Sequence, residues 1–454
     1  MSNHWAKDAV FYHVYPLGAC GAPPVNDFST QSQPRLERLL GHADRWKSLG
    51  VNALYLGPVF ESSSHGYDTA DYFRVDRRLG DNALLARVVR ELHARQIRVV
   101  LDGVFHHVGR EFWAFQELRR DRERSARRSW FSGVRFDRPS PSGESFAYDG
   151  WAGCHELVKL ELTNPEVRGH LLEAVDFWLR EFDIDGLRLD VAESLESGFV
   201  RELARFCRER RPDFWLLGEM IHGDYRRLAA PGALDSTTNY ECYKGLWSSL
   251  NDRNYFEIAH TLRRQFGPHG LYRELQLYTF VDNHDVDRVA GLLGNRRHLF
   301  PLYLLLFTMP GVPSIYYGSE WGIRGRKRDG DAALRPELPG PGTSPEVPEP
   351  GLAEAIARFA ALRHATAALR HGSYRELMVE PERFAFARET GEDSVIVVLN
   401  AGPGPSQLDL ALPDLEGRAV VDLLNGGERF AIDGRKVRLT LEPCWGRVLR
   451  VERA

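Results

Sequence analysis

Several short apolar runs in this chain end in acidic and basic residues whose types could carry acid–base or nucleophilic chemistry. The central run is residues 182–189, which read as a strand followed by Asp190. Side chains alternate along a strand, so Arg188 and Asp190 point to the same face. Arg188 would lower the pKa of Asp190 and keep it ionised, which suits a nucleophile or an electrostatic stabiliser. Taken alone, this stretch fits a structural ion pair equally well.

Glu219 is a second candidate, because it follows the apolar residues 215–217 and precedes Met220 and Ile221. Apolar surroundings and nearby carboxylates would raise the pKa of Glu219 and keep it protonated. An ionised Asp190 facing a protonated Glu219 is the arrangement of a retaining glycosidase, with an expected separation of about 5–5.5 Å. Taken alone, Glu219 also fits a buried salt-bridge partner.

Asp285 is a third acid, at the end of residues 282–285 and directly after His284. As an isolated residue it fits a helix N-cap before Val286. Together with Asp190 and Glu219, we expect it to bind sugar hydroxyls and to keep Glu219 protonated through the proximity of like charge.

Two histidines, His107 and His284, accompany these acids, and Asp102 ends another strand just before His107. Each histidine alone fits a core residue, a metal ligand or a hydroxyl binder. Neither a His-x-x-x-His pattern nor a carboxylate triad surrounds them, so the sequence predicts no metal site. We expect both to donate hydrogen bonds to the hydroxyls of a polyol, with Asp102 in the same binding site.

Alternating strands and helices are the elements that would position these residues. The expected strands are residues 10–15, 51–56, 97–102, 182–189, 214–218, a weaker one near 234, 275–281 and 313–317. The expected helices are residues 36–49, 82–96, 165–182, 198–208, 255–266 and 299–308. This alternation predicts an α/β fold, a (β/α)8 TIM barrel, in which catalytic groups from several strands meet at the strands' carboxyl ends.

Two segments depart from the alternation. The polar, Arg-rich residues after the third strand are too many for an ordinary loop and predict a small inserted domain. The last part of the chain has short strands separated by Gly, Asp and Asn turns, which predicts an all-β sandwich. We therefore divide the chain into barrel residues 1–107, an insertion at 108–160, barrel residues 161–373 and a C-terminal β-sandwich at 374–454.

The composition limits which binding partners and which cellular compartment are expected for this protein. The net charge of −4 includes no long run of one sign, so neither a nucleic-acid nor a membrane partner is expected. Five scattered cysteines without metal spacing favour free thiols in a reducing compartment. With no basic-then-apolar leader and no transmembrane run, we expect a cytoplasmic protein. The oligomeric state is left open.

The residues and their order resemble the α-amylase family of glycoside hydrolases, family 13, over nearly the whole chain. The motifs that carry the resemblance are residues 65–72, 102–107, 186–190, 218–219, 280–285 and 311–320. Residues 157–161 and 219–224 are closest to cyclomaltodextrinase-like and neopullulanase-like members, and intracellular α-amylase-like members are also similar. The resemblance assigns the inserted domain as the family's domain B and the tail as its domain C.

The resemblance also implies residue roles. Asp190 would be the nucleophile, Glu219 the general acid/base and Asp285 the transition-state stabiliser. The implied sugar-binding residues are Arg188, His107, His284, Tyr67 stacking on the sugar at the cleavage point, Asp68 beneath it, Asp102, Glu193 and His222. Asp331 and Arg335, in a long loop, are candidates for binding the sugar beyond the cleavage point, and a solvated loop fits them equally well. The sequence predicts no cofactor, because His106 stands where the family commonly has an Asn that ligates a structural calcium.

The expected activity is retaining hydrolysis of α-1,4-glucosidic bonds in maltooligosaccharides, cyclodextrins or starch-derived glucans. Residues 191–194 carry neither the Lys-His pair of α-amylases nor the Asn-Glu pair of cyclomaltodextrinases, so the substrate is left open. A glucanotransferase or a disaccharide-isomerising enzyme could use the same site. A catalytically silent binding module is a further alternative, although such a protein would be expected to lose some of the three acids.

Overall fold

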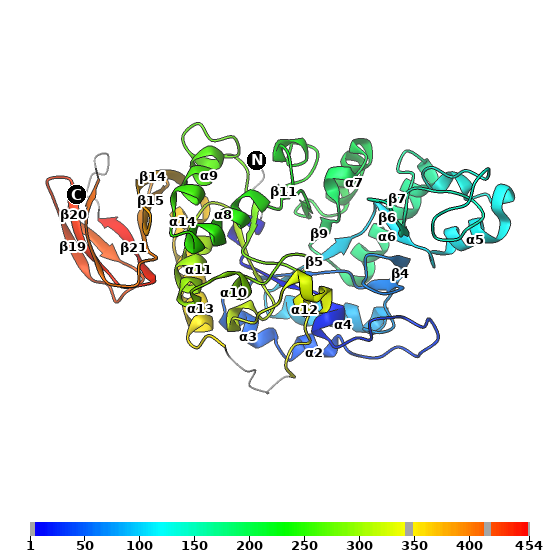
Figure 1. Ribbon diagram of the computed structural model, residues 1–454, viewed down its shortest axis with the longest axis horizontal. Coiled ribbons are helices and arrows are strands. Elements are labelled where there is room, and N and C mark those ends of the chain that lie inside the picture. The colour runs from blue at the N-terminus through cyan, green and yellow to red at the C-terminus, as the bar shows by residue number, and fades with distance from the viewer. Residues whose placement is uncertain (1–4, 341–347, 413–418, 453–454) are drawn as a thin grey trace.

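A closed barrel of parallel strands forms the centre of the molecule (Figure 1). The computed structural model describes residues 5–340, 348–412 and 419–452. Within these ranges eight strands pair in sequence order, β1 pairs with β13, and a bridge between Thr238 and Tyr278 closes the ring. The strands are β1 (Phe11–Val14), β2 (Ala53–Leu56), β5 (Arg98–Gly103), β9 (Gly186–Leu189), β10 (Trp215–Gly218), β11 (Ser236–Thr237), β12 (Tyr278–Phe280) and β13 (Val312–Tyr316). The predicted (β/α)8 barrel is confirmed.

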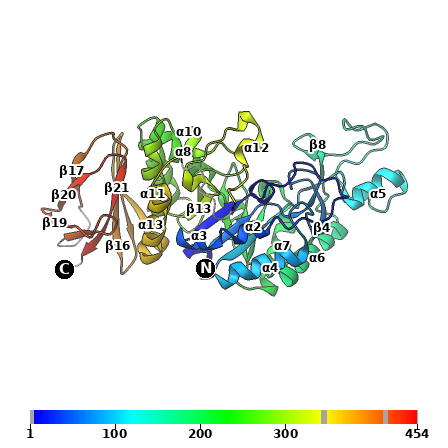
Figure 2. The same ribbon diagram turned by 90° about the horizontal axis from the view of Figure 1, so that it is seen from below.

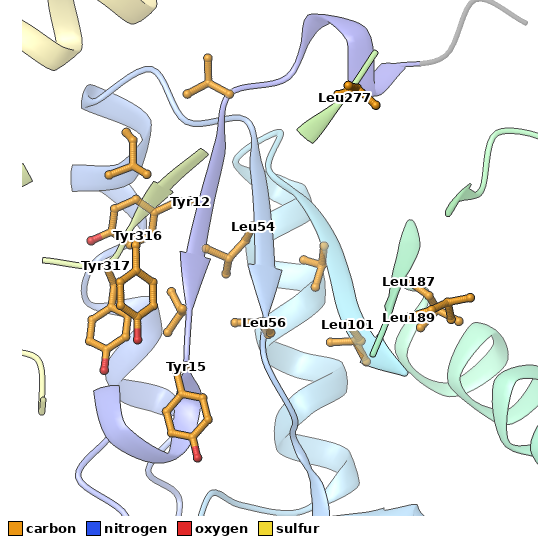
Figure 3. Packing of buried hydrophobic residues seen from close by; sticks show 14 of the residues in the cluster. Tyr12, Tyr15, Leu54, Leu56, Leu101, Leu187, Leu189, Leu277, Tyr316 and Tyr317 are labelled. Atoms are coloured by element: carbon orange, nitrogen blue, oxygen red, sulfur yellow. The ribbon is translucent and has the colours of Figure 1, made fainter. Parts of the chain in front are cut away.

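Buried side chains on these strands divide into two sets with the two-residue period of a strand. One set fills the barrel interior and includes Phe11, Val100 and Leu217. The other set packs against the surrounding helices, and Figure 3 shows part of it, with Tyr12 beside Tyr316 and Tyr317, Leu54 and Leu56 on β2, and Leu187 and Leu189 on β9. Because both faces of each strand are buried, the strands appear in the sequence as nearly continuous apolar runs.

Helices surround the barrel. The longer ones are α4 (Asn82–Ala94), α6 (Pro165–Phe182), α7 (Ser197–Arg210), α8 (Tyr240–Asn251), α9 (Phe256–Phe266), α11 (Leu299–Thr308) and α13 (Leu352–Ala365). The shorter ones are α1 (Pro16–Ala19), α2 (Glu37–Leu40), α3 (Ala43–Ser48), α10 (Val289–Leu292), α12 (Asp331–Leu334) and α14 (Ala367–His371). The single helix expected at residues 36–49 is divided at Gly41 and His42 into α2 and α3, and α8 was not predicted.

The segment after the third barrel strand forms a small domain of its own, which we call domain B. It contains β6 (His107–Gly109), α5 (Trp113–Asp121), β7 (Gly150–Trp151) and β8 (Cys154–Lys159), with strand order β6-β8-β7. A second excursion follows β2, where β3 (Phe60–Ser62) and β4 (Thr69–Val75) form a hairpin whose turn carries Tyr67 and Asp68. Domain B lies at one end of the molecule and the C-terminal domain at the other, with the barrel between them (Figures 1 and 2).

The C-terminal domain is an antiparallel sheet folded into two layers. Its strands are β14 (Ser373–Val379), β15 (Arg383–Glu389), β16 (Ser394–Asn400), β17 (Ser406–Ala411), β18 (Ala419–Asp422), β19 (Arg429–Asp433), β20 (Lys436–Leu441) and β21 (Trp445–Glu452). Ile396 and Val398 of one layer meet Leu410 and Leu439 of the other in a separate apolar core, which confirms the predicted sandwich. Helices α11 and α13 lie between this domain and the barrel (Figure 2).

Candidate active site

The inward-facing residues of three adjacent strands change from apolar to ionisable along the barrel axis. On β5 the inward residue Val100 is followed two residues later by Asp102, and on β10 Leu217 is followed by Glu219. On β9 the corresponding positions are Arg188 and Asp190. The strands are parallel and in register, so these side chains meet at their carboxyl ends.

Arg188 is the hub of this cluster. Its Nη1 donates to Asp190 Oδ1 at 2.7 Å and to Asp102 Oδ1 at 3.0 Å, and its Nη2 lies 2.8 Å from Glu219 Oε1. Asp190 and Glu219 therefore bind neighbouring nitrogens of one guanidinium. This places the two carboxyl groups close together, as the double-displacement mechanism requires.

The prediction for the pKa of Asp190 was wrong in direction. Burial raises this pKa, and the negative charges of Glu219 and Asp102 add to the effect, although Arg188 opposes it. The sequence suggested one arginine for one aspartate, whereas three carboxyl groups share Arg188. Because Asp190 and Glu219 are close, a proton held by one of them favours ionisation of the other.

Asp102 lies behind Arg188 and has no exposed side-chain surface. Its Oδ2 accepts hydrogen bonds from Tyr55 at 2.7 Å and from Tyr67 at 3.1 Å, in addition to the contacts with Arg188. This placement corrects the expectation that Asp102 touches the sugar. Asp102 instead positions Arg188 and Tyr67, which are the groups that face the site.

Asp285, with a side chain that is 39% exposed, lies among groups that favour its ionised form. Partial burial works against ionisation, but His284, whose Nε2 is 3.0 Å from Oδ2, and Arg335, whose Nη2 is 3.1 Å from Oδ1, hold the pKa of Asp285 well below its usual range. The helix-cap interpretation does not apply, because Asn283 caps this turn by accepting from the amides of Asp285 and Val286. The carboxylate of Asp285 is thus open to a ligand.

Tyr67 and His284 form one wall of the site. Their rings stack at a centroid distance of 5.4 Å and an angle of 11°, and the Tyr67 hydroxyl is 2.5 Å from His284 Nε2. Asp68 is buried and accepts a 2.6 Å hydrogen bond from Ser64, so it supports the turn that carries Tyr67. Both predicted residues after β2 are therefore placed by the β3–β4 hairpin.

His107 lies beside the proposed nucleophile, with Nε2 at 3.8 Å from Asp190 Oδ2. Burial, with smaller effects of His106 and His65, lowers the pKa of His107 to about 3, so the ring is neutral at neutral pH. In the described part of the chain, His107 Nε2 has no hydrogen-bond partner. A neutral imidazole with a free ring nitrogen next to the nucleophile suits a sugar hydroxyl.

Four further predicted residues lie at or outside the rim. Glu193 is in a 3-10 turn (Ala192–Ser194), and its Oε2 is 3.4 Å from the backbone nitrogen of His222, which is exposed. Asp331 in α12 is half exposed and pairs with Lys327 at 2.9 Å and with Arg335 at 3.2 Å. Arg335, expected to bind sugar, donates hydrogen bonds to Asp285 and to the backbone carbonyl of His284.

Val191 is a residue of the site that sequence reasoning missed. Its amide donates a 3.1 Å hydrogen bond to Glu219 Oε2, which holds the carboxyl group beside Asp190. Val191 has φ of 46°, a strained value for a β-branched residue. A valine gives no sequence signal for this conformation.

The residues around His106 do not fit a calcium ion, which prefers six to eight oxygen ligands. His106 Nδ1 is 3.3 Å from His107 Nδ1, and burial together with the charge of Lys159 lowers the pKa of His106 to about 4. In the loop before α2, Asp27 uses its oxygens to bind Ser29 and Thr30. Over residues 5–340, 348–412 and 419–452, no group of three or more His, Cys, Asp or Glu side chains is placed to hold a metal.

Two facing carboxyl groups on a shared guanidinium, at the carboxyl end of a (β/α)8 barrel, define the active site of a retaining glycosidase. Comparison with known proteins supports the assignment of this site to a glycosidase. Residues 36–338 match the family "Alpha amylase, catalytic domain", and residues 374–445 match "Maltogenic Amylase, C-terminal domain". The chain therefore belongs to the α-amylase family of glycoside hydrolases.

Individual relatives extend this comparison. A cyclomaltodextrinase of Geobacillus thermopakistaniensis is 31% identical over 97% of this chain and 76% of its own length. Neopullulanase 2 of Thermoactinomyces vulgaris is 32% identical over 98% of this chain and 78% of its own length. Among solved structures, a cyclic α-maltosyl-(1→6)-maltose hydrolase of Arthrobacter globiformis, in complex with that sugar, has a TM-score of 0.84 and 27% identity, covering 98% of this chain and 99% of the other.

Proposed function

We propose that the protein hydrolyses α-1,4-glucosidic bonds in maltooligosaccharides, cyclodextrins or starch-derived glucans with retention of configuration. The observation that carries this proposal is the placement of Asp190 and Glu219 on neighbouring nitrogens of Arg188. The names of the relatives, a cyclomaltodextrinase and a neopullulanase, support a substrate of this class.

The proposed mechanism has two displacement steps. Glu219 protonates the glycosidic oxygen while an Asp190 carboxylate oxygen attacks the anomeric carbon, so the bond to the leaving sugar breaks and a glycosyl ester of Asp190 forms. Glu219, now ionised, then takes a proton from water, which attacks the same carbon and releases Asp190. Asp285, His107 and His284 would bind the ring hydroxyls and stabilise the oxocarbenium-like transition states.

A glucanotransferase or a disaccharide-isomerising enzyme is a second candidate. The observation that favours it is the pair Glu193 and His222 at the rim beside Glu219, where polar groups could hold an incoming sugar in place of water. A catalytically silent binding module is the least supported alternative, since Asp190, Glu219 and Asp285 are all present and face one site.

We further propose that the enzyme works without calcium or another cofactor, because a histidine pair and a nearby lysine do not form a calcium site. The proposed partner is the glucan alone. The proposed location is the cytoplasm, a reducing compartment that suits the five free cysteines. Within the described ranges, no helix combines the length and apolar character needed to cross a membrane. The oligomeric state is not part of the proposal.

The test is a chromatographic product profile on maltotriose, cyclodextrin, soluble starch, pullulan and sucrose in parallel. Net release of reducing ends from maltotriose is expected for hydrolysis, whereas products longer than the substrate would favour transfer. Asp190→Asn should abolish turnover, with Asp409→Asn, a remote surface substitution, as the matched control. Undiminished activity of Asp190→Asn would rule out the proposed nucleophile.

A further inference from the structure

Domain B brings one exposed tryptophan to the mouth of the site. Trp151 ends β7, and the strand pair β7–β8 reverses through Ala152 and Gly153, with φ of 49° and 83°. Two consecutive residues with positive φ form the tight turn that joins antiparallel strands. This turn keeps Trp151 opposite Cys154, at the end of the hairpin, where 37% of its surface stays exposed.

The position of Trp151 is defined by its neighbour His107. The two rings lie 5.9 Å apart at an angle of 36°. Both residues belong to the same three-stranded sheet, in which β6 and β7 pair with opposite sides of β8. Since His107 Nε2 is 3.8 Å from Asp190, one imidazole separates the indole from the nucleophile.

A second exposed tryptophan of domain B, Trp113, shows that exposure alone does not identify a sugar-binding residue. It is 42% exposed in the same domain, but its ring packs against Trp130, and the guanidinium of Arg127 lies 5.6 Å from it. Trp113 therefore covers other protein groups, whereas Trp151 borders a residue of the catalytic site. Single exposed apolar side chains are common on proteins and carry no meaning without such a position.

We propose that Trp151 is a stacking platform that binds the glucose unit next to the one at the cleavage point, and so sets the preference for chains over single sugars. The faces of α-linked glucose units are rich in C–H groups, which pack on an indole, while the indole N–H is available to a hydroxyl. Such aromatic anchors with few polar groups are typical of ligand sites. This proposal rests on the proposed glucan substrate and adds a specificity-determining residue to it.

The test compares a one-sugar substrate with a longer one. α-D-Glucosyl fluoride occupies only the sugar position at the cleavage point, whereas maltotriose also reaches its neighbours. For Trp151→Ala we expect kcat/KM on maltotriose to fall about 10-fold, mainly through KM, and kcat/KM on α-glucosyl fluoride to stay within about two-fold. Trp151→Phe should restore most of the loss, and Trp113→Ala should leave both substrates unchanged.

Two outcomes would overturn the proposal. Equal losses on both substrates would mean that Trp151 acts through His107, and no loss on either would mean that it contacts no sugar. Calorimetric binding of maltotriose provides a readout that does not need turnover: Trp151→Ala in the Asp190→Asn background should raise Kd about 10-fold, and an unchanged Kd would refute the platform. Failure of the unmodified enzyme to release reducing ends from maltotriose would instead refute the proposed hydrolase activity.

Discussion

Asp102→Asn gives the sharpest prediction about how the site is organised. The carboxylate of Asp102 accepts from Arg188 at 3.0 and 3.2 Å, from Tyr55 at 2.7 Å and from Tyr67 at 3.1 Å. An asparagine keeps one acceptor oxygen and presents an amide N–H group to donors on its other side. Removing one partner of a buried ion pair costs about 3–5 kcal/mol, so we expect a clear fall in the free energy of unfolding.

The catalytic consequence follows from Arg188, which Asp102 positions against Asp190 and Glu219. A displacement of about 1 Å in a catalytic group lowers activity about 100-fold, and we expect a loss of this order in kcat/KM on maltotriose. The negative charge of Asp102 also raises the pKa of Asp190. Because the nucleophile must be ionised, removing that charge should move the acidic limb of the kcat/KM profile to lower pH.

The assay is a pH series of initial rates on maltotriose, together with urea unfolding of the same samples. Asp409→Asn, which removes a surface partner of Arg438, controls for the chemical change. A merely destabilised protein would lose activity without a shift of the acidic limb. Wild-type kcat/KM, or an acidic limb that moves to higher pH, would refute the role assigned to Asp102.

Three further predictions concern pH and metal. Burial lowers the pKa of His106 to about 4 from its ordinary value of 6.5. Below pH 6.5 the unfolded chain therefore binds a proton at this histidine that the native state does not bind, and the free energy of unfolding decreases as the pH falls toward 4. His106→Asn should flatten this loss by up to about 1.4 kcal/mol per pH unit in urea unfolding, and an unchanged slope would contradict the buried neutral ring. Arg335→Gln removes a cation that lowers the pKa of Asp285, so NMR titration of the Asp285 carboxyl group should give a higher pKa in the variant, and an unchanged pKa would show that Arg335 does not tune this acid. Excess EDTA should change neither activity nor Tm, and a drop in Tm that added calcium reverses would refute a calcium-independent fold.

The sequence predicts the catalytic cluster well where the strand period decides the outcome. Arg188 and Asp190 had to share a face, and the parallel strands had to bring Glu219 to the same end of the barrel. The number of carboxyl groups that share Arg188 depends on the register between strands, which the local pattern does not contain. For this reason the direction of the Asp190 pKa was wrong, and Asp102 was expected to touch the sugar.

Residues placed by irregular segments were harder to predict. Trp151 reaches the site only because β7 and β8 form a tight hairpin, and nothing near residue 151 in the sequence indicates that His107 will lie beside it. The strained backbone of Val191 has no side-chain signature. Helix α8 was missed because aromatic and small residues obscure its helical period. The break between α2 and α3 shows that Gly41 and His42 can divide a stretch whose apolar residues follow a helical period.

The central claim is that Asp190 forms the covalent bond to the sugar. The most direct measurement is mass spectrometry of enzyme inactivated with 5-fluoro-α-D-glucosyl fluoride, a substrate whose glycosyl-enzyme intermediate turns over slowly. Peptide mapping should locate one added fluoroglucosyl group on the peptide containing Asp190, and Asp190→Asn should remain unlabelled. A label on Glu219 or Asp285, or substrate turnover without any labelled intermediate and with inversion at the anomeric carbon, would contradict the account.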